Sequence, residues 1–89
     1  MGRPPARVLS DIGRRVGELR RLRSWTQQDL ADAMGVSLGY VQGIEAGREN
    51  LTVRSLALLA AVLRANPIEL WRAPKSRARR RPGRPKKTT

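Results

Sequence analysis

Hydrophobic positions between residues 10 and 71 recur three or four residues apart, which is the spacing of one face of a helix. The first such stripe is formed by Ile12, Val16 and Leu19, and a longer one lies within residues 53–65. No segment alternates between apolar and polar residues with a period of two, as a half-buried strand would. The pattern therefore predicts an all-α domain.

Capping residues divide this region into five short helices. Side chains that accept hydrogen bonds from the first turn of a helix stand before each apolar stripe, and Gly35 and Gly47 are placed to end the second and third helices. The fourth helix is expected from Val53 to about Ala65. The predicted N-caps are Ser10 or Asp11, Thr26, Ser37, Thr52 and Asn66, the last with proline at the first helical position.

The second and third predicted helices form a unit within Thr26–Gly47. Ala31 is small enough for the two helices to cross closely, and Gly35 supplies the positive φ that a sharp turn between them needs. Val41 and Ile44 anchor the third helix to the core. This arrangement leaves the N-terminal end of the third helix exposed, and that end is the part that enters a DNA major groove in helix-turn-helix proteins.

Composition removes most enzyme classes. The 89 residues contain neither Cys nor His, so a disulfide framework, a thiol nucleophile and a Ser-His-Asp triad are excluded. We expect no catalytic residue, no metal site and no cofactor. The longest apolar run has eight residues, at 56–63, whereas about 20 are needed to span a bilayer. We therefore expect no membrane partner and a cytoplasmic, nucleoid-associated protein.

The net charge of +12 is concentrated at the ends of the chain. Residues 10–71 carry eight basic and seven acidic groups, as an ordinary globular domain would. Residues 72–89 carry nine basic groups, no acid and three prolines, so we expect a disordered polybasic tail. Residues 1–9 carry two arginines and are expected to form a flexible arm. Such a charge favours nucleic acid as the partner.

Residues 8–71 resemble the lambda-repressor/Cro-like (Xre) helix-turn-helix family. The resemblance is carried by Thr26-Gln27, Leu30-Ala31, Gly35-Val36-Ser37, Val41, Ile44-Glu45, Gly47 and Asn50-Leu51-Thr52. Within the family, the residues from Tyr40 to Glu45 and from Arg48 to Thr52 are similar to the controller proteins of restriction–modification systems, although those carry Arg where Leu38 stands. The resemblance implies a compact five-helix fold.

The family also implies DNA contacts for individual residues. Gln42 is expected to hydrogen-bond a base edge, with adenine as its preferred base. For Tyr40, the alternative to a phosphate contact is packing against the core. For Gln42, the alternative to a base contact is that it is an ordinary solvated residue. Arg20 and Glu45 match an ion pair between the first and third helices. The base-contact candidates are Ser37, Leu38, Gly39, Gln42 and Gly43, and the phosphate-contact candidates are Gln27, Tyr40, Arg48 and Asn50.

A second apolar edge on the last two helices predicts a homodimer. The apolar surface is larger than the core of one small domain can bury, which favours a two-fold interface there. Such a dimer would place the third helices of both copies on a pseudo-palindromic operator. The interface candidates are Leu58, Val62, Ile68 and Trp71.

The tail resembles an AT-hook between Arg81 and Lys87, with Pro82 where that family has arginine. Two alternatives are a phosphate-binding arm without sequence preference and a tail unrelated to DNA. The candidate DNA contacts are Arg79, Arg80, Arg81, Arg84, Lys86 and Lys87.

These features predict a bacterial or phage transcription regulator that binds double-stranded DNA, with RNA polymerase as a further candidate partner and no small-molecule ligand. Two alternatives are an antitoxin-type protein-binding module and a weakly specific architectural DNA-binding protein. The polar tail argues against the antitoxin, which would carry a long apolar C-terminal segment.

Overall fold

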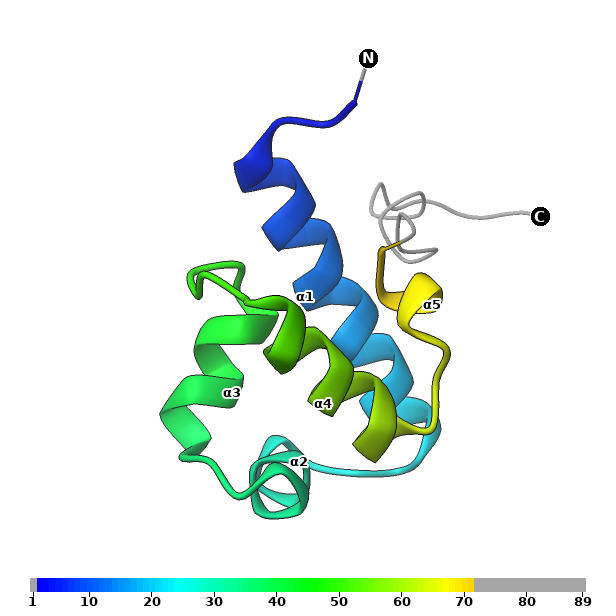
Figure 1. Cartoon of the computed structure of the whole chain (residues 1–89). Coiled ribbons are helices and arrows are strands. Elements are labelled where there is room, and N and C mark those ends of the chain that lie inside the picture. Colours follow the sequence, from blue (N-terminus) through cyan, green and yellow to red (C-terminus); the bar gives the residue numbers. More distant parts are fainter. Residues whose placement is uncertain (1, 72–89) are drawn as a thin grey trace, which may run out of the picture.

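The computed structural model describes residues 2–71, which form five helices and no strand (Figure 1). The all-α, five-helix prediction is confirmed for this part of the chain. The helices are α1 (Pro5–Leu22), α2 (Gln27–Met34), α3 (Leu38–Glu45), α4 (Val53–Leu63) and α5 (Pro67–Trp71).

The long helix α1 packs against most of the domain. It contacts α3, α4 and α5, while α2 packs against α3 and α4. Figure 1 shows α3 and α5 on opposite sides of α4, with α1 behind them. Every helix contributes to one buried core, whose fully buried members include Ile12, Val16, Leu30, Val41, Ile44, Leu59 and Leu70. The face of α3 that points away from this core is therefore held on a rigid support.

Four of the predicted helix starts are confirmed. Thr26 and Asp29 form a capping box at α2, in which the Thr26 side chain accepts from the Asp29 backbone N–H at 3.0 Å. Ser37 accepts from the Tyr40 N–H, and Thr52 accepts from the Ser55 N–H. Asn66 Oδ1 accepts from the Ile68 N–H at 2.9 Å and starts α5. Each cap satisfies a backbone donor that the first turn of a helix leaves open.

The predicted start of α1 is wrong. The helix begins at Pro5 after an extended Pro4, so residues 5–9 of the expected flexible arm are helical. Proline is well suited to the first helical position because its fixed φ matches the helix and its missing N–H is not needed there. Asp11 is not a cap but a buried residue inside the helix, where its Oδ2 lies 2.7 Å from Arg3 Nη1.

The end of α4 also differs slightly from the expectation. The helix stops at Leu63, and Arg64 adopts a left-handed conformation with φ 54°. Leu59, Ala60 and Leu63 are buried as the apolar stripe predicted, while Leu56 is partly buried.

Candidate nucleic-acid interface

The turn between α2 and α3 has the geometry that the sequence predicted. Gly35 has φ 73°, and the Val36 N–H donates to the Ala31 carbonyl at 3.0 Å, which closes the end of α2. Ala31 is fully buried where the helices cross. Val41 and Ile44 are buried and fix α3 against the domain. Because both ends of the turn are anchored, the direction in which α3 projects is fixed.

One side of α3 faces solvent. Ser37, Gly39, Gln42 and Ala46 are exposed, and Leu38 is partly exposed. Gly43 shares this side by helical periodicity, yet it is buried. A Cβ added to Gly43 would lie 2.8 Å from Glu49 Oε2, so the Glu49 side chain occupies the space in front of it. The structure thus brings four of the five base-contact candidates to an accessible surface.

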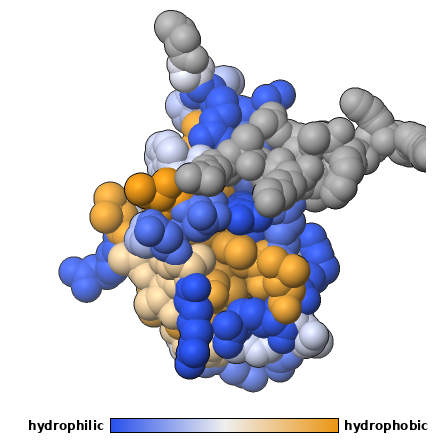
Figure 2. Space-filling model, turned by 90° about the vertical axis from the view of Figure 1, so that its right-hand side faces the viewer, coloured by the Kyte–Doolittle hydropathy of each residue, from blue (hydrophilic) through white to orange (hydrophobic). Residues whose placement is uncertain are grey.

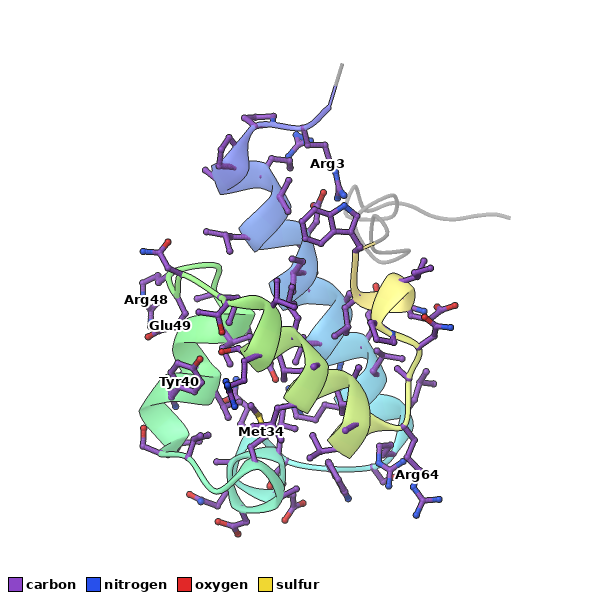
Figure 3. The ribbon with its side chains drawn as sticks, viewed as in Figure 1. Arg3, Met34, Tyr40, Arg48, Glu49 and Arg64 are labelled. Atoms are coloured by element: carbon purple, nitrogen blue, oxygen red, sulfur yellow. The ribbon has the colours of Figure 1, made fainter. Side chains whose placement is uncertain are left out.

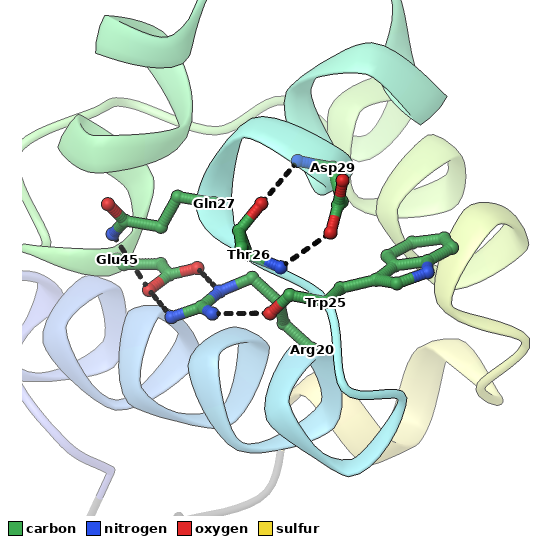
Figure 4. A network of polar contacts seen from close by, with 6 residues as sticks. All are labelled: Arg20, Trp25, Thr26, Gln27, Asp29 and Glu45. Carbon is green, nitrogen blue, oxygen red and sulfur yellow. Dashed lines mark hydrogen bonds and ion pairs between the residues drawn. The ribbon is translucent and has the colours of Figure 1, made fainter.

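Three polar side chains tie α1, α2 and α3 together behind this surface (Figure 4). Arg20 Nε donates to Glu45 Oε2 at 2.7 Å and Arg20 Nη2 donates to Oε1 at 3.0 Å, which confirms the ion pair between α1 and α3. Arg20 Nη1 also donates to the Trp25 carbonyl. The hydrogen bond to Glu45 raises the pKa of Arg20 despite its burial, so the guanidinium stays charged.

Gln27 is the first residue of α2, where the sequence placed it. Its amide donates from Nε2 to Glu45 Oε1 at 3.1 Å, which joins it to the Arg20–Glu45 pair. Its amide oxygen and second N–H are not used in this bond. A contact with DNA would therefore have to use these remaining groups.

The other phosphate candidates occupy two different environments. Tyr40 is half-buried against the core, and its hydroxyl lies 3.3 Å from Ser55 Oγ, a geometry that agrees with the packing alternative. Arg48 and Asn50 are exposed in the loop after α3. Figure 3 shows Arg48 at the outer edge of the molecule and Tyr40 turned from α3 toward α4.

A family model described as helix-turn-helix matches residues 16–70, which span the turn, α3 and the supporting helices. The chain belongs to the helix-turn-helix family. This confirms the Xre-type resemblance drawn from the turn residues.

Three relatives of this helix-turn-helix chain illustrate the match. An uncharacterized HTH-type transcriptional regulator of Sinorhizobium fredii, y4dJ, is 36% identical over 59 residues, which cover 66% of this chain and 77% of the relative. The restriction-modification controller protein C.AhdI from Aeromonas hydrophila is 35% identical, with a TM-score of 0.66 over 70% of this chain and 94% of C.AhdI. The clp gene regulator ClgR from C. glutamicum is 27% identical, with a TM-score of 0.67 over 71% of this chain and 82% of ClgR.

The helix-turn-helix domain has exposed apolar side chains on α4 and α5. Ile68 is 62% exposed, Trp71 54% and Leu58 39%, while Val62 is partly buried. Figure 2 faces the α5 side and shows orange and pale orange surface gathered there. The four dimer candidates thus lie on the last two helices, three of them well exposed. The tail candidates between Arg79 and Lys87 lie outside the described residues.

Three residues have structural roles that the sequence did not predict. Arg3 links the start of the chain to α5, because its Nη2 donates to the Trp71 carbonyl at 2.7 Å. Gly13 lies where α1 meets α3, and Glu49 covers Gly43. No local signal in the sequence distinguishes these residues from their neighbours, since each role depends on a contact between different elements.

Residues 2–71 offer neither a cluster of metal ligands nor a membrane-spanning helix. These residues contain no group of three or more acidic, histidine or cysteine side chains that could hold a metal ion. None of the helices described here is both long enough and apolar enough to cross a membrane.

Proposed function

We propose that this chain is a transcription regulator that binds a specific DNA operator through α3. The observation that carries the proposal is the rigidly anchored turn that leaves Ser37, Gly39 and Gln42 on one open face of α3. A helix with its side chains is about 10–12 Å across and fits a major groove about 12 Å wide. The regulator activity of the relatives, as their names give it, supports the same conclusion.

Within this proposal, contacts divide into two kinds. Gln42 accepts and donates at a base edge, which its planar amide can do at adenine, and Leu38 contacts a thymine methyl group. Arg48 and Asn50 bind phosphates beside the groove and fix the orientation of the domain. Gln27 at the start of α2 and Tyr40 in the first turn of α3 are further candidates for hydrogen bonds to phosphates. Gly39 permits close approach of the backbone.

The chain acts as a homodimer in this proposal. Ile68 and Trp71 on α5 and Leu58 on α4 place apolar side chains in water, and a two-fold contact of the last two helices would cover apolar surface in both copies. The two copies of α3 would then contact half-sites about 34 Å apart along one face of the DNA. Binding at a promoter controls transcription by blocking or contacting RNA polymerase. The proposed location is the cytoplasm, where the operator DNA lies.

Selection of bound sequences from a random DNA pool tests the function. We expect a pseudo-palindromic consensus whose half-sites are centred about 10 base pairs apart. The Gln42→Ala variant should lose roughly 1–3 kcal/mol on that consensus and tolerate other bases at one or two positions per half-site. Gln28→Ala, an exposed glutamine on α2, serves as the matched control and should keep the consensus. Recovery of no preferred sequence would contradict the function.

The dimer is tested on the same consensus by sedimentation and by the stoichiometry of binding. Ile68→Glu places a charge in the proposed interface and should yield monomers that bind the full site weakly. Val53→Glu changes a side chain that is 83% exposed at the other end of α4 and should leave the dimer intact. A chain that is monomeric at micromolar concentration and binds one copy per site would overturn the dimer while leaving the DNA-binding function in place.

A further inference from the structure

Glu49 differs from the other acidic residues of the chain in its surroundings. The sequence has seven acids. Six of them hold a hydrogen bond or ion pair with a named partner: Asp11 with Arg3, Glu18 and Glu69 with Arg15, Asp29 with the Thr26 N–H, Asp32 with Gln28, and Glu45 with Arg20. Within residues 2–71, the structure records no hydrogen bond or ion pair for the Glu49 carboxylate.

The Glu49 side chain lies on the proposed DNA-facing side of α3. Successive residues of a helix are turned by about 100°, so Gly39, Gln42, Gly43 and Ala46 fall within one arc. Glu49 fills the notch that Gly43 leaves in this arc: a Cβ at that position would lie 2.8 Å from Glu49 Oε2 and 2.9 Å from its Cγ. Figure 3 shows Glu49 beside Arg48 at the outer edge of α3. The loop thus supplies a side chain where the helix itself has none.

A carboxylate at this place has few acceptable partners in DNA. Phosphates repel it, and its oxygens can only accept hydrogen bonds. The major groove offers two amino donors, cytosine N4 and adenine N6. Adenine carries the acceptor N7 beside N6, which repels a carboxylate, whereas cytosine N4 has no acceptor of its own base next to it in the groove. Cytosine is therefore the base that fits.

We propose that Glu49 is a specificity-determining residue that accepts a hydrogen bond from the N4 amino group of a cytosine, next to the base contacted by Gln42. Gly43 is the positioning residue, because its missing side chain leaves the space in which the carboxylate lies. This inference rests on the proposed function, in which α3 enters the major groove.

The test measures binding of the full chain to its selected consensus and to every single-base variant of one half-site. We expect the wild type to prefer cytosine at one position by roughly 5- to 100-fold, as a good side-chain contact to a base edge does. Glu49→Ala should lose this preference. Glu49→Gln should relax it, because its amide can still accept from cytosine N4 but can also donate to acceptors on other bases. Both variants should keep the preferences at the other positions. If Glu49→Ala raises affinity for all sequences equally and every preference survives, the carboxylate only repels phosphates and the proposal is overturned.

Gly43→Ala tests the positioning role. The added methyl group should displace Glu49 and remove the cytosine preference, and it should cause no further loss at that position in the Glu49→Ala background. Gly2→Ala is the control, since a Cβ there would meet no atom within 4 Å and the residue lies before α1, and it should keep the cytosine preference. Retention of the preference in Gly43→Ala would contradict the positioning role.

The outcomes for the two proposals are separable. A wild-type chain that selects no sequence overturns the proposed function and this inference with it. A wild-type chain that selects a consensus, but whose preferences are all unchanged by Glu49→Gln and Glu49→Ala, overturns the inference alone.

Discussion

Arg20 donates hydrogen bonds from three of its nitrogens, and these bonds reach α3 and the segment before α2. Two go to Glu45 at the end of α3 and one to the Trp25 carbonyl before α2. Its neighbour Gln27 bonds the same carboxylate. Arg20 is only 9% exposed, so this charge is compensated by the protein rather than by water. The Arg20 side chain therefore links α1 to the end of α3 and to the segment before α2.

Replacing Arg20 should be costly because it leaves Glu45 without its charged partner. Arg20→Ala should lower the free energy of unfolding by about 3 kcal/mol, the size expected when one member of a largely buried ion pair is removed. The raised pKa of Arg20 means that its contribution is complete below the unfolded-state pKa and is lost only as the pH rises through the folded-state value, far above neutrality. The loss should thus be the same at pH 6 and pH 8.

Urea denaturation of the two variants Arg20→Ala and Arg21→Ala makes the comparison. Arg21 follows Arg20 on α1 but is exposed, so its removal should change stability by less than about 0.5 kcal/mol. Equal stability of the two variants would show that the network does not hold the helices together.

At the scale of elements, the helices could be predicted because their signals are local. Thr26, Ser37 and Thr52 act through backbone groups three residues away, and Gly35 acts through its own φ. The start of α1 could not be settled in this way, because Ser10-Asp11 and Pro4-Pro5 are both acceptable beginnings of a helix. Packing against the core favours the start at Pro4-Pro5, because Val8 contacts the core and extends the apolar stripe of α1 toward the N-terminus.

The role of Gly13 depends on a contact between two helices, which local sequence signals do not predict. It lies inside α1, where glycine disfavours a helix. The crossing of α1 and α3 explains it: a Cβ there would be closest to the Ile44 carbonyl oxygen and 2.7 Å from the Glu45 carbonyl oxygen. Both atoms are backbone at the C-terminal end of α3, so they cannot turn aside as a flexible side chain would. The closeness of the two helices therefore depends on this glycine.

Gly13→Ala should destabilise the domain although it improves helix propensity. Overpacking a tight contact costs about 1–3 kcal/mol, which exceeds the gain of up to about 1 kcal/mol from replacing glycine in a helix. Gly39→Ala would bring its Cβ no closer than 3.9 Å to its nearest neighbour, Ser37 Oγ, and should be neutral or stabilising. Thermal unfolding of the two variants gives the comparison, and a Gly13→Ala variant as stable as Gly39→Ala would mean that α1 and α3 can separate at little cost.

At the scale of the whole molecule, the candidate interface divides into parts that the sequence could predict and parts that it could not. Gln42, Arg48 and Asn50 are exposed as expected, because periodicity and loop position decide exposure. Periodicity also places Gly43 on the exposed side, where the side chain of Glu49 covers it. That contact joins the helix to the loop after it, and neither propensity nor spacing encodes the fold of a loop. The same holds for Arg3, which donates a hydrogen bond to the carbonyl of Trp71, 68 positions further along the chain.

Charge is also distributed unevenly over the molecule, and this predicts how binding depends on salt. Residues 73–89 carry eight of the basic groups, whereas residues 10–71 are nearly neutral. If about five of the eight neutralise phosphates, each contributes about 0.9 to the slope of log K against log salt concentration. A chain ending at residue 72 should therefore have a slope smaller by about 4–5 and should lose mainly its affinity for random DNA.

The consensus selected by the truncated chain should be unchanged, because α3 is intact and phosphates carry no sequence information. Arg48→Ala in the full chain provides the scale, since the loss of one phosphate contact should reduce the slope by only about 1. Arg84→Ala separates the two DNA-binding alternatives for the tail: loss of a preference for AT-rich flanks indicates insertion of this arginine into a narrow minor groove. A reduced slope without any such preference would leave the phosphate-binding arm, and an unchanged slope after truncation would rule out both, because neither can bind DNA without releasing counterions.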